Sequence, residues 1–138
     1  MTNISKKGQI FLLTLSLVIV FSFAIVIGQK GLLDGKVFVG QSREKNIRTV
    51  KEDELRFVDG KFHSMSYGLE GFIEGVYETR VEGDKISFEA ETVNPKQGRI
   101  QWRGIVHRES IEVNYHWSKK GWLSDTEKNY SFNGTLKK

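Results

Sequence analysis

Few side chains of this 138-residue chain have the types and spacing that metal binding requires. The three histidines are His63, His107 and His116, and the chain has no cysteine. His107 and His116 fall at opposite ends of one predicted hairpin, too far apart to share a metal ion. A zinc site needs three or four convergent ligands. We therefore interpret the histidines as surface residues and predict no metal site.

Paired carboxylates are the second candidate for chemistry. Glu89 and Glu91 share one face of a predicted strand, as do Glu74 and Glu78, and carboxylates about 5–9 Å apart can serve glycoside hydrolysis. The same spacing is typical of a solvated face where acidic and basic residues alternate, each pair adding only tenths of a kcal/mol. No Ser-His-Asp, Cys-His, phosphate-binding or metal-spacing motif accompanies them. We therefore expect a protein that is not an enzyme and that uses no cofactor.

Aromatic side chains form the clearest candidate site. In four predicted strands they alternate with polar residues, so they share the face that points away from water. Two interpretations stay open: they fill a barrel core, or they line an apolar pocket at the open end of a barrel, where a few polar groups would orient a ligand. The residues of such a pocket would be Phe88, Trp102, Tyr115, Trp117, Tyr130 and Phe132.

Trp122 stands apart from this pattern, in the predicted loop KKGWLSD at 119–125. With Lys119 and Lys120 beside it, this side chain could touch lipid headgroups or a protein partner, because Trp favours membrane interfaces. It could equally plug one end of a barrel. The sequence leaves both interpretations open.

The elements that position these residues are strands. From residue 31 onward apolar residues recur with period two, and turn signals interrupt them about every ten residues. Asp59-Gly60 predicts a type I′ turn, because both central residues of that turn need positive φ. Only the polar stretch 42–54 could hold a short helix. The predicted strands cover 35–41, 55–58, 61–67, 71–81, 85–93, 99–106, 111–118 and 127–136.

One apolar and one polar face per strand is typical of antiparallel sheets. Short loops between successive strands imply a meander, and closing the meander removes its two exposed edges. Gly75 and Gly104, inside predicted strands, would help the sheet to bend. We therefore expect an all-β domain over residues 31–138, an eight-stranded antiparallel up-and-down barrel.

The pattern resembles the lipocalin-like (calycin) barrels over residues 33–137. It combines a polar crossing and successive hairpins with the family's entry and closing residues, which correspond here to Gly35, Lys36, Phe38, Tyr130 and Phe132. It departs from the family in having Val37 or Phe38 where the family has a Trp, no cysteine for the family's disulfide, and no C-terminal helix after the last strand. The resemblance implies a barrel with an apolar interior and does not identify a ligand.

Residues 10–27, IFLLTLSLVIVFSFAIVI, form an uncharged apolar run preceded by Lys6 and Lys7. As a helix this run would span roughly 27 Å, close to the hydrocarbon thickness of a bilayer. We expect residues 1–30 to be an N-terminal hydrophobic helix, either an uncleaved membrane anchor or a cleaved signal peptide. A buried helix of a soluble fold is the third alternative, but the rest of the chain offers no helices to cover it. Both leading alternatives make residues 31–138 an exported domain, membrane-anchored or secreted.

The charge of the chain argues against a nucleic-acid partner. The net charge is +4, and Lys6, Lys7 and Lys30 contribute three of these positive charges. Beyond residue 30, 18 Lys and Arg therefore face 17 Asp and Glu, which gives no strongly positive field for phosphates. The sequence predicts a non-enzymatic barrel that binds a small apolar ligand inside. The alternative is a protein- or membrane-surface interaction module with a filled core and no ligand.

Overall fold

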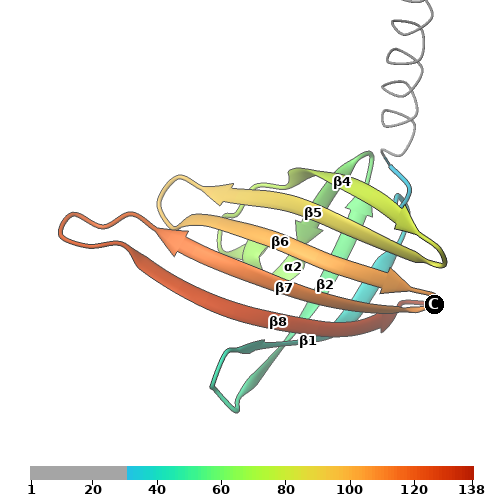
Figure 1. Ribbon diagram of the computed structural model, residues 1–138. Helices are drawn as coiled ribbons and strands as arrows, with labels where there is room; N and C mark the ends of the chain where they lie inside the picture. Colours follow the sequence, from blue (N-terminus) through green and yellow to red (C-terminus); the bar gives the residue numbers. More distant parts are fainter. Residues whose placement is uncertain (1–30) are drawn as a thin grey trace, which may run out of the picture.

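The computed structural model describes residues 31–138, so the predicted leader at 1–30, with its membrane segment at 10–27, lies outside the described residues. The described strands form one closed barrel, in which each strand pairs antiparallel with the next and the last returns to the first (Figure 1). This confirms the predicted all-β, eight-stranded antiparallel barrel. The strands are β1 (Val37–Glu44), β2 (Val50–Val58), β3 (Lys61–Ser64), β4 (Gly75–Glu82), β5 (Lys85–Asn94), β6 (Gly98–His107), β7 (Ser110–Lys119) and β8 (Thr126–Leu136).

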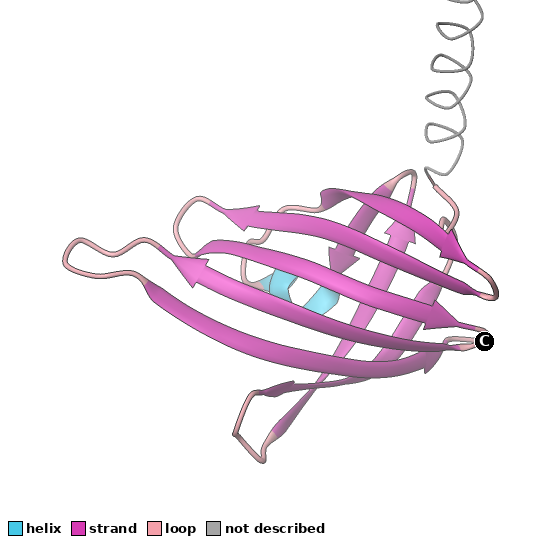
Figure 2. Cartoon of the chain, viewed as in Figure 1, coloured by secondary structure: helices cyan, strands magenta, loops and turns pink. Residues whose placement is uncertain are grey.

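Several predicted boundaries are wrong, because the strands expected at 35–41, 55–58, 61–67 and 71–81 begin or end elsewhere, and two of the differences concern helices. The polar stretch 42–54 holds no helix, because β1 continues to Glu44 and β2 already begins at Val50. The short helix α2 (Met65–Leu69) instead replaces the second half of the predicted strand 61–67, as Figure 2 shows. The strand stops at Ser64 because that side chain caps the helix, accepting a hydrogen bond from the backbone N–H of Tyr67 at 3.3 Å.

The interior of the barrel is packed with aromatic rings. Phe57 lies at its centre, with ring centroids 5.0 to 6.2 Å from those of Phe38, Phe62, Tyr77 and Phe88. Each fully buried side chain of this size contributes roughly 1.5–3 kcal/mol. The buried hydrophobic residues, none more than 5% exposed, are Leu33, Phe38, Leu55, Phe57, Phe62, Phe72, Tyr77, Phe88, Ile100, Trp102, Val106, Ile111, Val113, Tyr115 and Phe132.

Gly104 of β6 shows how tightly this interior is filled. A Cβ added to this glycine would overlap the Phe88 ring of the neighbouring strand. The glycine was predicted to let the sheet bend, and the structure adds a second reason for it, which is room for an aromatic neighbour.

One end of the barrel is sealed by the first described residues. Leu33 is fully buried, and its backbone N–H donates to the Tyr77 hydroxyl at 3.1 Å. That hydroxyl donates to Asp34 Oδ1 at 2.6 Å, and the same oxygen accepts from the N–H of Gly60 at 3.0 Å. Burial, together with the Asp34 carboxylate, raises the pKa of Tyr77 above its usual value. Asp59 and Gly60, with φ of 50° and 74°, form the predicted tight turn at this end.

Candidate functional site

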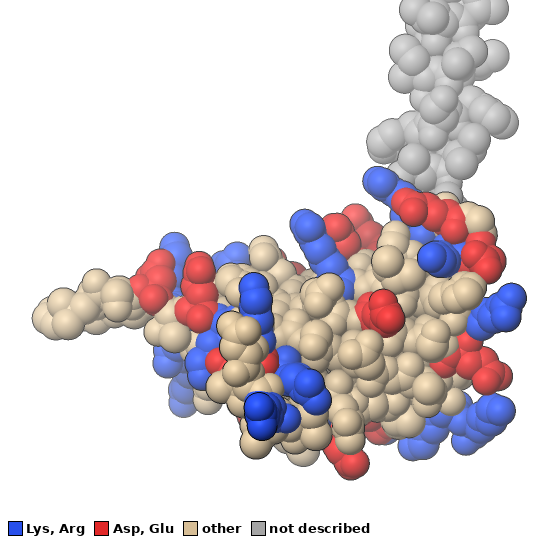
Figure 3. All heavy atoms as spheres, turned by 60° about the horizontal axis from the view of Figure 1, so that its bottom comes forward, with Lys and Arg blue, Asp and Glu red and all other residues tan. Residues whose placement is uncertain are grey.

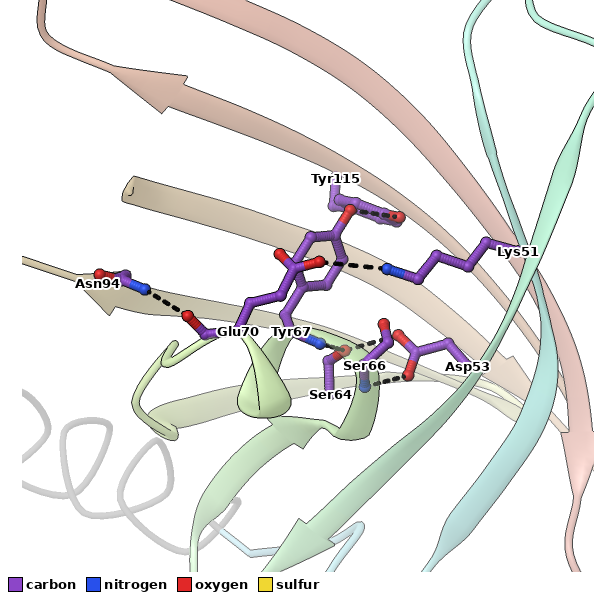
Figure 4. Close-up of polar contacts among 8 residues, drawn as sticks. All are labelled: Lys51, Asp53, Ser64, Ser66, Tyr67, Glu70, Asn94 and Tyr115. Carbon is purple, nitrogen blue, oxygen red and sulfur yellow. Dashed lines mark hydrogen bonds and ion pairs between the residues drawn. The ribbon is translucent and has the colours of Figure 1, made fainter. Parts of the chain in front are cut away.

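The opposite end of the barrel, which we call the mouth, is closed by α2 rather than by a strand. β3 pairs with β4 at only two positions, Lys61↔Val76 and Phe62↔Gly75. β2 pairs with β3 from Leu55 onward, so residues 50–54 have no strand partner on that side. The chain that links β3 to β4 crosses this gap, and α2 packs against β2 there (Figure 4).

Asp53 of β2 fastens α2 in this position. Its buried carboxylate accepts from the Ser64 hydroxyl at 2.6 Å and from the backbone N–H of Ser66 at 2.9 Å. It also accepts from the N–H of Glu54 at 2.7 Å, on the edge of β2 that no strand covers. Three donors satisfy the buried charge, and the carboxylate takes the place of the missing strand partner.

Tyr67 is the residue of α2 that enters the mouth. Its ring makes edge contacts with Phe72, Trp102 and Tyr115, with centroids 5.6, 5.8 and 5.7 Å away. Its hydroxyl shares a hydrogen bond of 3.2 Å with the Tyr115 hydroxyl. Burial raises the pKa of Tyr67 well above its usual value, and the neighbouring Tyr115 adds to the shift. Tyr67 thus closes the mouth of the barrel.

Polar contacts at the surface hold α2 and Tyr67 in place from outside. Lys51 Nζ lies 3.4 Å from Glu70 Oε1 and 5.3 Å from the centroid of the Tyr67 ring. Asn94 Nδ2 donates to the backbone carbonyl of Glu70 at 3.0 Å. Figure 4 shows Lys51 and Asn94 reaching Glu70 from opposite sides. Because Lys51 and Glu70 are both half exposed, the ion pair stabilises the closed mouth only weakly.

Next to Tyr67, three rings form a stack across β6, β7 and β8. Trp102 and Tyr115 have centroids 4.3 Å apart, and Tyr115 and Tyr130 are nearly parallel at 4.9 Å. The indole N–H of Trp102 donates to Thr92 Oγ1 at 2.9 Å. Burial raises the pKa of Tyr115 and of Tyr130, and the carboxylate of Glu44 adds to the shift of Tyr130.

All six predicted pocket residues face the interior. Phe88, Trp102, Tyr115 and Phe132 are buried, whereas Trp117 and Tyr130 are partly buried and pack against the core at the mouth. The indole N–H of Trp117 donates to the backbone carbonyl of Gln97 at 2.7 Å. The structure therefore brings the six residues together, and their binding of a ligand stays a prediction.

Trp122 does not plug the barrel, so that interpretation is wrong. Its side chain is 95% exposed and that of Leu123 is 87% exposed. The reason is the length of the last hairpin, since β7 and β8 remain paired out to Lys119↔Thr126. Figures 1 and 3 show the loop at 120–125 projecting beyond the barrel, with an apex free of acidic and basic colour and charged residues gathered behind it. Lys119 and Lys120 are exposed beside it, as the prediction of a contact loop requires.

The predicted histidines and carboxylates lie on the outer surface. His107 contacts Asp84 at 2.8 Å, and the hydrogen bond from this imidazole lowers the pKa of Asp84. Glu89 and Glu91 face cross-strand arginines, with N–O distances of 3.4 and 3.5 Å. This arrangement fits the interpretation of a solvated face, where alternating charges interleave.

The remaining two histidines also lack metal partners. His116 Nδ1 is 2.8 Å from Asn129 Oδ1, and the His63 ring lies against Gly68 of α2, where an added Cβ would overlap it. Across residues 31–138, no group of three or more His, Cys, Asp or Glu side chains could hold a metal ion. Within the same residues no helix is long and apolar enough to cross a membrane.

The sequence did not predict the residues that close the mouth. Asp53, Ser64, Tyr67 and Glu70 were assigned to a polar crossing, a strand and a loop, and nothing in their spacing indicates that they meet. One local signal was available, because Ser64 is a residue type that favours helix N-caps.

The comparisons with known proteins leave this geometry as the basis for interpretation. No family model matches the chain, and no curated protein and no solved structure is significantly similar to it. The closed barrel is consistent with a calycin-like fold, and the likeness concerns the fold alone.

Proposed function

We propose that this protein is a non-enzymatic binding module whose sealed barrel presents the Trp122–Leu123 tip to a protein partner. The observation that carries the proposal is the exposure of this pair, 95% and 87%, at the end of a projecting hairpin. Leaving two adjacent large apolar side chains exposed to water is unfavourable. Trp is also enriched among the few interface residues that contribute most of the binding free energy.

The filled interior supports a function on the outside of the barrel. Leu33 closes one end and Tyr67 closes the other, and the rings between them are in contact. Hollows lie on the outer surface instead, and one of them, of about 1080 Å³, is lined by residues of β8, β1, β2 and α2. Both features favour the predicted interaction module with a filled core.

The position of the tip favours a protein over the membrane of the predicted anchor. Leu33 and Asp34 are fixed at one end, and β8 runs its 11 residues from beside the tip to that same end. Strands rise about 3.4 Å per residue and tilt by roughly 40° in barrels, so the tip lies on the order of 25–30 Å farther along the axis. An anchor at 10–27 would therefore join the barrel at the end opposite the tip, which leaves the tip free to meet a protein.

Site-specific photo-crosslinking in intact cells tests this proposal. A photoreactive residue placed at Trp122 should give a discrete crosslinked product, and Leu123→Asp in the same chain should abolish it. The matched control is a photoreactive residue at Ile105, an apolar side chain of β6 that is 48% exposed away from the tip. Equal crosslinking at both positions, or a product that survives Leu123→Asp, would refute the contact.

A small apolar ligand is the second candidate function, and the mouth favours it. Tyr67, Trp117 and Tyr130 are only partly buried there and pack directly on the aromatic core, so a ligand at this end would meet the predicted pocket residues. The test is a titration of the full chain with an environment-sensitive apolar dye. Saturable binding that Trp117→Ala weakens supports this function, and the lack of a saturable signal discards it.

A further inference from the structure

The side chain of Tyr67 occupies its own binding site within the chain. Phe72, Trp102 and Tyr115 surround its ring on three sides at centroid distances of 5.6 to 5.8 Å. Edge-on contacts of this kind are favourable for any aromatic ring of the same size. The Tyr115 hydroxyl, 3.2 Å from that of Tyr67, offers one hydrogen bond at the inner end. Together these groups form a chamber shaped for a phenol.

The segment that carries Tyr67 has few buried contacts of its own. α2 has five residues, and none of them is buried. Apart from the ring contacts of Tyr67, its attachments are polar ones, to Asp53, to Asn94 and, through the ion pair of Glu70, to Lys51. Segments with few buried apolar contacts open at a much lower free energy than the whole fold. Opening of α2 would withdraw the Tyr67 ring and leave the chamber empty while the sheet stays intact.

We propose that α2 is a lid and that the chamber it uncovers binds a single-ring hydroxylated aromatic molecule in place of the Tyr67 side chain. The ligand ring would pack against Phe72, Trp102 and Tyr115, and its hydroxyl would hydrogen-bond to Tyr115. The Lys51 ammonium, now 5.3 Å from the Tyr67 ring centroid, would lie near the face of the incoming ring. This inference rests on the second proposed function and is independent of the Trp122 contact.

The Tyr67 side chain, which occupies the chamber in the closed form, weakens the affinity of the chamber for a ligand. A ligand that binds only the open form has an apparent Kd equal to its intrinsic Kd divided by the open fraction. Any change that removes Tyr67 or loosens α2 must therefore tighten binding, which a ligand site elsewhere on the barrel would not show. A variant with a weaker lid should therefore have a lower Kd for the ligand. This effect distinguishes the lid from an ordinary pocket.

The first experiment titrates the full chain with p-cresol, the side-chain analogue of tyrosine, and follows binding by calorimetry and by chemical shifts of the Trp102 indole. We expect Tyr67→Ala to bind p-cresol at least about tenfold more tightly than the parent, because no ring has to leave. Toluene should bind about fivefold more weakly than p-cresol, and Tyr115→Phe should erase that difference, because a neutral hydrogen bond is worth about this factor. Equal p-cresol affinity in Tyr67→Ala and the parent would overturn the inference.

A second variant keeps the inference testable if Tyr67→Ala does not fold. Glu70→Gln removes the ion pair with Lys51 at a half-exposed position, and it should lower the Kd for p-cresol about twofold, as expected for a surface ion pair that holds the lid. The matched control is Glu89→Gln, which removes an exposed ion pair with Arg103 on the outer face of β5 and β6 and should leave the Kd unchanged. An unchanged Kd in Glu70→Gln overturns the lid. Saturable dye binding without any p-cresol binding overturns the phenolic ligand and leaves the second proposed function standing.

Discussion

Replacing Asp53 by alanine should cost about 3 kcal/mol of stability and should loosen the mouth before the rest of the barrel. The carboxylate accepts three hydrogen bonds, at 2.6, 2.7 and 2.9 Å. The Ser64 hydroxyl is buried, so losing its acceptor costs about 2 kcal/mol, whereas the N–H groups of Glu54 and Ser66 can reach water and lose about 0.5 kcal/mol each. Asp53→Asn retains one acceptor oxygen, so we expect it to lose only about 1 kcal/mol.

Urea unfolding measures this difference. With a slope of about 1.5 kcal/mol per molar, the midpoint of Asp53→Ala should fall by about 2 M. Asp125→Ala is the control, because Asp125 is an exposed acid in the Trp122 loop and should change stability by less than about 0.5 kcal/mol. Amide exchange at residues 65–69 should rise in Asp53→Ala more than exchange in β6. If Asp53→Ala unfolds within about 1 kcal/mol of the parent, Asp53 does not fasten α2 and the reasoning is refuted.

Two further stability predictions follow from the ends and the centre of the barrel. Thr92→Val removes the acceptor of the buried Trp102 N–H, so it should cost about 1–3 kcal/mol in urea unfolding, and Thr92→Ser, which keeps the hydroxyl, should cost less; the reverse order would contradict the assigned hydrogen bond. Leu33→Ala should cost about 2–5 kcal/mol, because Leu33 is fully buried at the sealed end. Its neighbour Leu32 is 42% exposed, and Leu32→Ala should cost less than about 0.5 kcal/mol. Similar losses in the two variants would show that this end is not sealed.

Strand parity was the part of the fold that the sequence made predictable. Phe88, Trp102 and Phe132 point inward because a period of two leaves only one face free of polar residues, and that face has to be buried. The Asp59-Gly60 turn was predictable for a similarly local reason, since few residues accept positive φ at two successive positions.

The closure of the mouth was not predictable, because its determinants are distant in the chain. Residues 61–67 alternate in a way that also fits a strand, and they leave the sheet because Asp53, on another strand, captures Ser64 and Ser66. The interpretation of Trp122 as a plug was wrong for the same kind of reason. Whether a loop folds back over a barrel or projects from it depends on how far the pairing of β7 and β8 extends, here to Lys119↔Thr126, and the loop sequence does not carry that information.

The central structural claim is that aromatic residues fill the barrel and that α2 closes it, and the tyrosines report on both. The chain has four tyrosines, and burial raises the pKa of every one of them, Tyr67, Tyr77, Tyr115 and Tyr130. A raised pKa for a group that is neutral when protonated means that its contribution to stability is complete below the unfolded pKa of about 10. Above that pH the unfolded chain releases protons that the folded chain keeps, so each such tyrosine lowers stability by about 1.4 kcal/mol per pH unit.

The most direct measurement is therefore an alkaline titration that follows tyrosinate absorbance and circular dichroism in the same sample. We predict that Tyr67 and Tyr77, whose pKa values burial raises by a large amount, ionise only together with loss of the sheet, and that Tyr115 and Tyr130 ionise above pH 10. The urea-unfolded chain, as control, should titrate smoothly at about pH 10. Reversible ionisation of all four tyrosines near pH 10 with the sheet intact would contradict the account, because it would show that water reaches the rings at both ends of the barrel.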